Sequence, residues 1–305
     1  MDFEGFLTYL RTEKRSSPHT IESYGLDLLQ FASYCIHQFE VSEPTAVKTV
    51  MVRSWMAHLL EEKYEATSVH RKLSSVNAYF RFLAKTYIIK QNPAKGIIKP
   101  KLPGRLPVFV DERSTRALYA LQEQQSTECG SSDIQTQFFS YRNQLIVTLL
   151  YETGIRRAEL LGLCDSDIDF YKGQIKVTGK RNKMRFVPIG DDMCDKIKQY
   201  QIIRNQIVKQ FQSNHLFVTD KGKKISKTFV YLTVKGYLSQ VSTIKRKSPH
   251  VLRHTFATHM LNNGADLNVI KEILGHSSLA ATQVYTHNSI EKLKSIHQKM
   301  HPRNN

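Results

Sequence analysis

The sequence predicts a mainly α-helical protein of two domains, with one β-hairpin or small β-sheet in the second domain. Three observations carry this prediction: helical periodicity through the first ninety residues, a proline-rich stretch that follows, and one short run of alternating apolar and polar residues near position 177. A chain of 305 residues is long enough to bury two separate cores.

The N-terminal helical domain is predicted to span residues 1–90. Ser17 followed by Pro18 is typical of a helix start, and the helical apolar spacing continues to about Phe39. Pro44 predicts the start of a third helix. Packed against one another, such helices would bury the first core.

The helix expected over 67–85 has two distinct faces. Its apolar side chains recur at three- and four-residue spacing, and Thr67 is the expected N-cap. The opposite face carries polar side chains suited to DNA contact: Arg71, Ser74, Asn77 and Arg81. A merely solvated face is the alternative, and the basic composition of the chain favours DNA.

Residues 91–107 predict a basic linker between the domains, with the boundary near residue 103. Four of the nine prolines lie in this stretch, and prolines at this density stop helices and favour an extended chain. Basic side chains are interspersed among the prolines: Lys95, Lys99, Lys101 and Arg105. An extended basic segment suits a clamp that crosses a phosphate backbone, and a solvated tether is the alternative.

The charge of the chain indicates an anionic partner. Lysine and arginine number 44 against 27 acidic residues, which gives a formal charge of +17 and a pI of about 9.7. No apolar run is long enough to span a membrane, and the N-terminus lacks a signal-peptide pattern. The four cysteines are scattered without CxxC pairing, so we expect reduced thiols in a cytoplasmic protein. DNA is therefore favoured over a membrane surface.

Residues 108–305 form the second predicted domain, and its clearest element is a hairpin. Ile175 and Val177 alternate with polar residues, a turn follows at 179–183, and apolar residues then resume. Lys180 is expected at the tip of this hairpin.

Six side chains of this domain suit covalent attack on a phosphodiester: Arg156, Lys180, His250, Arg253, His276 and Tyr285. Arginine offers a planar pair of donors that matches two phosphate oxygens, and such preorganised cations are usually the largest catalytic term. Tyrosine can attack covalently, but its ordinary pKa of about 10 requires help from a cation or base. The leaving hydroxyl needs a proton, which Lys180 or His250 could supply.

The helix expected after residue 249 separates chemistry from core. His250 and Arg253 are three residues apart and share a face, which we expect to look toward DNA. Apolar side chains on the same helix are expected in the core: Val251, Leu252, Phe256 and Met260. Asp266 is the expected cap of the next helix, and Gly275 its expected end.

The acidic residues nearby are expected to be structural. Glu159 lies three residues after Arg156, so it is expected to hold that arginine in place and not to act as a base. Asp165, Asp167 and Asp169 imitate the start of a calcium loop, but the glycine and glutamate that such a loop requires are missing. We therefore expect no metal site.

These motifs carry a resemblance that covers nearly the whole chain. The stretch from HVLRHTFATHML through LGH and QVYTH to HQKMHP resembles the tyrosine recombinases of the phage integrase family, most closely the Xer-type recombinases that resolve chromosome dimers. The separation of 285 − 250 = 35 residues between His250 and Tyr285 fits that type. TGIRRAELLGL resembles the family's first arginine motif, and VTGKRNKMRFVPI resembles the hairpin with the catalytic lysine.

The resemblance implies a helical, SAM-like core-binding domain followed by a tyrosine-recombinase catalytic domain. It implies Tyr285 as the nucleophile, Arg156, Arg253 and His276 as phosphate ligands, His250 in proton transfer and Lys180 as the donor to the leaving 5′-hydroxyl. The implied reaction passes through a 3′-phosphotyrosine and a four-way junction, without a metal or nucleotide cofactor.

The implied partners are double-stranded DNA and further recombinase protomers. A tetramer is expected in the synaptic complex, formed by this chain alone or with a related recombinase. The helix expected over 289–300 is predicted to dock on a neighbouring protomer.

Other interpretations stay open. The polar segment 122–137 predicts a surface loop inserted between two helices, longer than the Xer type leads us to expect. Integrases or invertases of mobile elements share the same motifs and are therefore alternatives. A type IB topoisomerase-like enzyme and an architectural DNA-binding protein with an inactive site are more distant ones.

Overall fold

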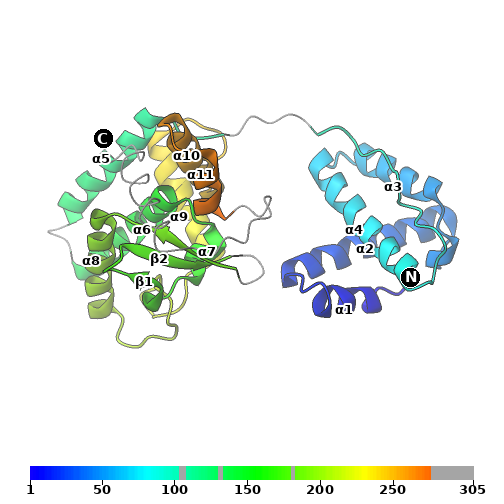
Figure 1. Cartoon of the computed structure of the whole chain (residues 1–305), viewed down its shortest axis with the longest axis horizontal. Coiled ribbons are helices and arrows are strands. Elements are labelled where there is room, and N and C mark those ends of the chain that lie inside the picture. The colour runs from blue at the N-terminus through cyan, green and yellow to red at the C-terminus, as the bar shows by residue number, and fades with distance from the viewer. Residues whose placement is uncertain (103–107, 130–132, 180–182, 276–305) are drawn as a thin grey trace. The chain divides into compact units, whose positions relative to one another are not determined.

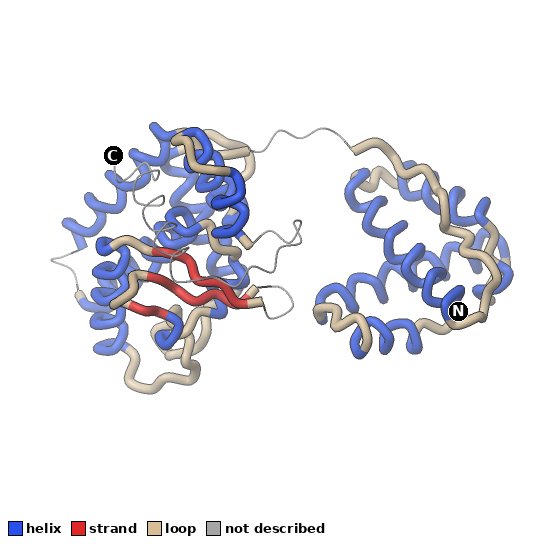
Figure 2. The backbone as a smooth tube through the Cα atoms, in the orientation of Figure 1, coloured by secondary structure: helices blue, strands red, loops and turns tan. Residues whose placement is uncertain are grey.

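A computed structural model describes residues 1–102, 108–129, 133–179 and 183–275 (Figure 1). The chain divides into two compact units, Met1–Arg105 and Leu106–Asn305. Helices dominate both units, and the strands of the described chain form one small sheet in the second (Figure 2). The predicted fold class is therefore confirmed.

The first unit is a helical bundle. Its helices are α1 (Glu4–Thr12), α2 (Pro18–Phe39), α3 (Thr49–Glu61) and α4 (Ala66–Lys85), with a 3₁₀ turn at Pro44–Ala46. Aromatic rings fill its centre, where Phe31 meets Trp55 and Phe80 edge to face at centroid distances of 5.0 and 6.1 Å. Burial of these rings supplies much of the hydrophobic stabilisation of the unit.

Helix boundaries in this unit test the sequence predictions. The start of α2 is confirmed, because the side chain of Ser17 accepts a hydrogen bond from the Thr20 backbone N–H. Pro44 opens only the 3₁₀ turn, and α3 begins later, at Thr49. The predicted cap at Thr67 was wrong: Glu65 has the extended backbone of an N-cap and α4 begins directly after it. The first helix, α1, had not been predicted.

The second unit contains the remaining elements. They are α5 (Glu112–Cys129), α6 (Ile134–Thr153), α7 (Arg157–Gly162), a 3₁₀ turn (Asp165–Asp167), β1 (Ile168–Asp169), β2 (Gln174–Thr178), β3 (Met184–Pro188), α8 (Asp191–Ile207), α9 (Lys227–Val241), α10 (Pro249–Asn262) and α11 (Leu267–Leu274). The strands are antiparallel in the order β1-β2-β3, with Val177 opposite Arg185. The predicted hairpin is thus confirmed, and β1 extends it to a sheet.

Helix α6 is the centre of the second core. Every side chain from Leu145 to Thr153 is buried, as expected for a helix surrounded by others, and α6 packs against α5, α8, α9 and α10. It ends at Gly154, whose φ of +59° is left-handed. A Cβ at Gly154 would lie 2.6 Å from Phe256 and 2.7 Å from Leu274, so α10 and α11 approach this turn closely. The absence of a side chain at Gly154 therefore lets the end of α6 pack closely against the middle of α10 and the end of α11.

The prediction of a loop over 122–137 was wrong for most of that segment. Helix α5 continues to Cys129, and α6 begins at Ile134 with the Asp133 carboxylate accepting from the Thr136 N–H at 2.8 Å. Glutamine and glutamate are good helix formers, and the segment has no proline to end α5 earlier. Its polar composition therefore reflects helix ends, not an irregular loop.

Candidate active site

The turn after α6 presents the first arginine. Arg156 is the N-cap residue of α7, and its backbone N–H donates to Glu159 Oε2 at 2.8 Å. Its guanidinium donates from Nη1 to Glu159 Oε1 at 2.8 Å and from Nη2 to the carbonyl of Gly275 at 3.1 Å. The side chain is 35% exposed, so part of its fork still reaches solvent. Two directed contacts thus fix an arginine that remains open on one side.

Helix α10 supplies the second arginine. Its apolar residues lie in the core as predicted: Val251, Leu252, Phe256 and Met260. Arg253 is itself largely buried, and donates from Nη1 to the carbonyl of Gly154 at 2.6 Å and from Nη2 to that of Leu274 at 2.7 Å. Burial, and then the charge of Arg156, lowers the pKa of Arg253 to about 10, so it stays cationic near neutral pH. Each terminal nitrogen carries a second N–H, which can donate a hydrogen bond to a phosphate oxygen.

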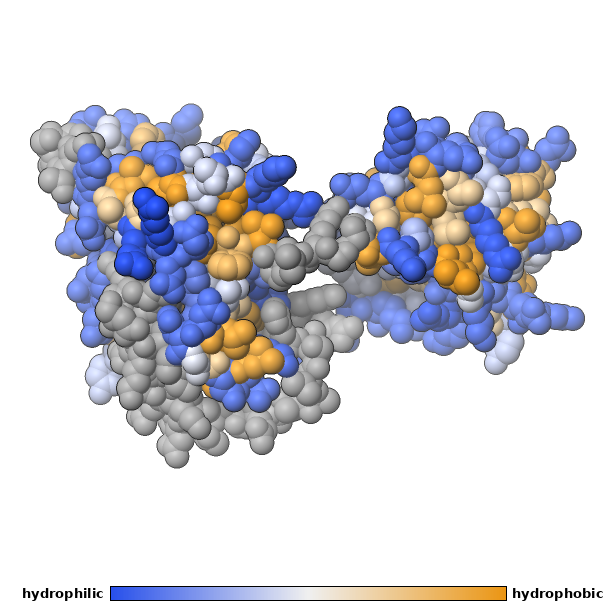
Figure 3. All heavy atoms as spheres, turned by 90° about the horizontal axis from the view of Figure 1, so that it is seen from above, coloured by the Kyte–Doolittle hydropathy of each residue, from blue (hydrophilic) through white to orange (hydrophobic). Residues whose placement is uncertain are grey.

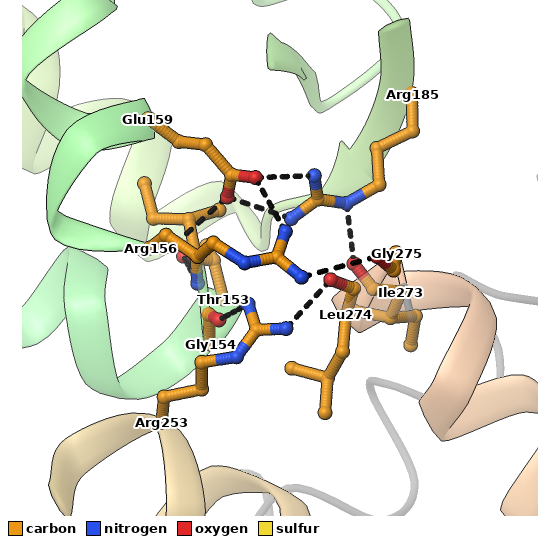
Figure 4. A network of polar contacts seen from close by, with 10 residues as sticks. Thr153, Gly154, Arg156, Glu159, Arg185, Arg253, Ile273, Leu274 and Gly275 are labelled. Atoms are coloured by element: carbon orange, nitrogen blue, oxygen red, sulfur yellow. Dashed lines mark hydrogen bonds and ion pairs between the residues drawn. The ribbon is translucent and has the colours of Figure 1, made fainter. Parts of the chain in front are cut away.

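Three arginines meet the C-terminus of α11 on successive carbonyls (Figure 4). Arg185 Nε donates to Ile273 at 2.7 Å, while Leu274 and Gly275 accept from the other two arginines. The last carbonyls of a helix have no partner within it and carry partial negative charge, which favours cations here. The predicted end of this helix is confirmed, because Gly275 has a φ of +63°.

Arg185 is a site residue that the sequence predictions missed. It lies on β3, its side chain is 7% exposed, and its two terminal nitrogens donate to the two oxygens of Glu159, each at 2.9 Å. The residue pattern of β3 could have indicated its burial: Arg185 and Val187 are two residues apart, so they lie on the same face of the strand, and both are buried. A charged side chain on the buried face of a strand indicates a paired or functional group.

Glu159 is the anion that these cations share. Burial alone would raise its pKa, but hydrogen bonds and charge from Arg185, together with hydrogen bonds from Arg156, hold the pKa below its usual value. The carboxylate is therefore ionised near neutral pH. It is a structural anion enclosed by arginines, which agrees with the expectation that it holds Arg156.

His250 lies at the exposed start of α10. Its pKa is lowered by partial burial and then by the charges of Arg157, His254, Arg253 and Arg156. The imidazole is consequently mainly neutral at pH 7 and able to accept a proton. Of the other histidines on this helix, His254 is exposed, whereas His259 is buried with Nδ1 3.0 Å from the Tyr151 hydroxyl.

The substitution Arg157→Gln should raise the pKa of His250. Removing a positive neighbour makes the protonated imidazole less unfavourable, so the pKa moves up toward its ordinary value of about 6.5. An NMR titration of the imidazole measures this change. Arg246→Gln, in the loop before α10, is the matched control and should leave the pKa unchanged. Equal titration curves for wild type and Arg157→Gln would contradict the assigned electrostatic contact.

Three predicted catalytic residues lie outside the described residues: Lys180, His276 and Tyr285. The predicted helix over 289–300 lies outside them as well. The residues that precede Lys180 and His276 are placed. Gly179 closes the hairpin by donating to the Lys183 carbonyl at 2.8 Å, and a Cβ built on Gly179 would lie 3.4 Å from Glu159 Oε1. Gly275 directly follows α11 and accepts from Arg156. Gly179, which directly precedes Lys180, thus lies beside Glu159. Gly275, which directly precedes His276, is bound to Arg156.

The polar face of α4 is occupied in part by the linker. Asn92 donates to Asn77 at 2.8 Å, and Lys99 donates to Ser74 at 2.8 Å. His70 Nε2 lies 2.6 Å from the carbonyl of Pro100. Three of the proposed DNA-contact side chains, Ser74, Asn77 and Lys99, therefore already have partners within their own unit.

The other proposed DNA-contact side chains differ in their exposure and in whether they already have an ion-pair partner. Arg71 is exposed but forms an ion pair with the buried carboxylate of Asp27. The other exposed candidates are Arg81, Lys95 and Lys101, whereas Lys99 is exposed but already donates to Ser74, and Arg105 lies outside the described residues. Exposure leaves these cations accessible to a phosphate backbone.

The aspartates of the calcium-like segment have structural partners. Asp165 binds Arg204 at two points, with Nη1–Oδ1 at 3.0 Å and Nη2–Oδ2 at 2.7 Å. Asp167 pairs with Lys176 at 3.0 Å, and Asp169 accepts from the Lys172 N–H at 2.8 Å. Each carboxylate thus contributes to local structure.

The surface in the view of Figure 3 is mainly hydrophilic, with smaller hydrophobic patches. Across the described ranges, no helix combines the length and apolarity that crossing a membrane requires. The described part of the face in Figure 3 therefore offers a partner mostly hydrophilic groups.

Two family models match the sequence. The model of the phage integrase family matches residues 122–292, and that of the phage integrase N-terminal SAM-like domain matches residues 3–86. The chain belongs to the phage integrase family. The resemblance stated from the motifs is therefore confirmed.

Relatives of known type agree with the family assignment. The tyrosine recombinase XerC of Chlorobaculum parvum is 37% identical, over 98% of this chain and 94% of the relative. XerC of Halalkalibacterium halodurans is 36% identical, over 98% and 96%. In fold, the chain resembles the XerH recombinase bound to its difH substrate, with a TM-score of 0.69 at 19% identity over 95% of this chain and 79% of XerH. It likewise resembles the Tn1549 transposon integrase, with a TM-score of 0.68 at 19% identity over 95% and 92%.

Proposed function

We propose that this protein is a tyrosine site-specific DNA recombinase of the Xer type, which exchanges DNA strands through a covalent 3′-phosphotyrosyl intermediate. The observation that carries the proposal is the convergence of Arg156 and Arg253 on the end of α11, where the chain continues to His276. Two fixed guanidiniums with N–H groups to spare suit the two non-bridging oxygens of one phosphate.

The proposed chemistry exchanges one phosphodiester for another. The Tyr285 oxygen forms a bond to phosphorus, the bond to the 5′-oxygen breaks, and no water or oxidant is consumed. The proton of Tyr285 passes to a base, for which the neutral His250 is suited. Lys180 protonates the leaving 5′-oxygen, and His276 joins the arginines on the phosphate. Attack by the 5′-hydroxyl of a partner strand reverses these steps and completes the exchange.

The proposal assigns a role to each part of the chain. Residues 1–90 bind one side of the duplex, 91–107 cross the backbone as a basic linker, and 108–305 carry the chemistry. A tetramer, formed by this chain alone or with a related recombinase, would assemble two DNA sites in the synapse, with the 289–300 helix docked on a neighbour. Resolution of chromosome dimers on the cytoplasmic nucleoid is the role that fits Xer-type relatives, which cover nearly the whole chain.

Trapping covalent adducts in cells tests this proposal. Cells that express wild type or Tyr285→Phe are lysed in denaturant, and DNA that stays attached to the protein is sequenced. We expect adducts at the 3′ ends of one defined site in wild type and none in Tyr285→Phe, because phenylalanine lacks the attacking oxygen.

The location of the recovered DNA separates the alternatives. A single chromosomal site near the replication terminus supports dimer resolution, whereas element ends or inverted repeats indicate integration or inversion. Adducts scattered without a defined site indicate a topoisomerase-like relaxer. Bound DNA without adducts in either strain contradicts the recombinase proposal and favours an architectural protein.

A further inference from the structure

We propose that Arg185 is a positioning residue for strand cleavage, which holds both phosphate-binding arginines through Glu159 and the end of α11. This inference rests on the proposed function. It assigns a role in the reaction to a side chain that does not itself face the substrate.

The contacts of Arg185 join three elements that are distant in sequence. From β3, its two terminal nitrogens bind both oxygens of Glu159 on α7, and its Nε binds the Ile273 carbonyl of α11 (Figure 4). All three side-chain nitrogens are thus engaged, and a planar fork on a carboxylate fixes orientation as well as distance. Arg185 therefore acts as a buried cross-link between the elements that surround the site.

The first consequence concerns Arg156. Glu159 Oε1 accepts from both Arg156 and Arg185, and Glu159 Oε2 accepts from the Arg156 backbone and Arg185. Arg185 sets the plane of the carboxylate, and the carboxylate then sets the guanidinium of Arg156. Without Arg185, the carboxylate could rotate toward Arg156 and draw its fork away from a phosphate.

The second consequence concerns Arg253. Its Nη2 donates to Leu274, the carbonyl that follows the one held by Arg185. A Cβ at Gly275 would lie 3.1 Å from Arg185 Cδ and 3.2 Å from its Nε, so the arginine is packed directly against the end of the helix. Arg185 therefore holds the helix end whose next carbonyl, that of Leu274, accepts from Arg253.

Burial separates the role of Arg185 from that of Arg156, whereas Arg253 is as buried as Arg185 and differs from it in that its terminal nitrogens donate to backbone carbonyls and not to Glu159. The Arg185 side chain is 7% exposed, against 35% for Arg156, and its fork points into Glu159. Arg156 retains an open side for the phosphate. Arg185 thus belongs to the support of the site and not to its phosphate-binding surface.

The test compares two substrates in variants of Arg185. A duplex with the site recovered from cellular adducts is prepared with either the normal scissile phosphate or a methylphosphonate, in which one charged oxygen is replaced by methyl. Single-turnover cleavage by the full-length protein is measured for wild type, Arg185→Gln, Arg185→Lys and Arg156→Ala. Arg204→Gln is the matched control, because Arg204 is also buried, binds Asp165 at two points and donates to the carbonyl of Leu216.

We expect Arg185→Gln to lower the cleavage rate on the normal phosphate by on the order of 10²-fold, as misplacement of catalytic groups commonly does. On the methylphosphonate the loss should be much smaller, as for Arg156→Ala, because less charge then needs stabilisation. Arg185→Lys should keep only part of the activity, since an ammonium cannot hold a carboxylate and a carbonyl in a fixed fork. Arg204→Gln should affect both substrates equally, and only through its folded fraction.

Several results would overturn the inference. An equal loss on both substrates for Arg185→Gln would mean a structural role only, and wild-type cleavage by Arg185→Lys would exclude positioning by the fork. If Arg185→Gln does not fold, Arg185→Lys carries the same comparison of substrates. Absence of any cleavage by wild type would instead remove the proposed function, and this inference with it.

Discussion

Replacing Arg253 with alanine should lower the rate of DNA cleavage by about 10²–10³-fold, which corresponds to a loss of about 3–4 kcal/mol of transition-state stabilisation. Arg253 is buried, cationic and fixed by the carbonyls of Gly154 and Leu274, so its remaining N–H groups need no reorganisation when charge develops on the phosphate. Low exposure also keeps water from screening that interaction. The measurement is single-turnover formation of the covalent adduct on a short duplex.

Two control variants separate chemistry from DNA binding. Arg246→Ala removes an exposed cation from the loop before α10, and should weaken DNA binding at most modestly, with little change in the cleavage rate of bound DNA. Arg253→Lys keeps the charge but cannot hold two carbonyls and two phosphate oxygens in one plane, so it should remain strongly impaired. A loss below about tenfold for Arg253→Ala would show that this arginine is not a main source of stabilisation.

The sequence predicted the parts of the site that depend on local residue patterns. The three-residue spacing of His250 and Arg253 placed both on one helix, and the αL preference of glycine placed the end of α11 at Gly275. The alternation around Ile175 and Val177 located the hairpin. Each of these inferences depends on residues within a few positions of one another.

The missed features depend on tertiary contacts. The carbonyls of Ile273, Leu274 and Gly275 accept from arginines that lie far from them in sequence, and no local periodicity indicates which side chains will meet a helix end. Arg185 was overlooked for the same reason, because its partner Glu159 is 26 residues away. Burial of a charge is visible only after the elements have packed.

The residue spacing of α4 predicted its polar face, but this spacing alone does not establish that the face binds DNA. The spacing identified the exposed face correctly, but Ser74 and Asn77 bind the linker through Lys99 and Asn92. In the described chain, these contacts make the linker part of the first unit's surface. Any DNA contact by Ser74 or Asn77 must therefore share or replace these hydrogen bonds.

The substitution Glu159→Gln should lower the free energy of unfolding of the second unit by about 3–5 kcal/mol, the range expected when one member of a buried ion pair is removed. The Glu159 side chain is 2% exposed, so water cannot replace the charge that Arg185 loses. The amide also directs N–H groups toward a guanidinium that needs acceptors. Chemical denaturation monitored by the transition of the second unit measures the change.

A control substitution at a more exposed ion pair and the pH dependence of stability together test whether the buried charge of Glu159 causes the loss of stability. Asp165→Asn removes the partner of Arg204, but the Asp165 side chain is 46% exposed, so we expect a loss of only about 1 kcal/mol or less. The pKa of Glu159 is lowered in the folded protein, so its contribution is complete above the unfolded pKa of about 4.3 and is lost as pH falls toward the folded value. The stability gap between wild type and Glu159→Gln should therefore be full at pH 7 and shrink in acid. A gap that stays constant with pH would assign the loss to packing, since glutamine does not titrate.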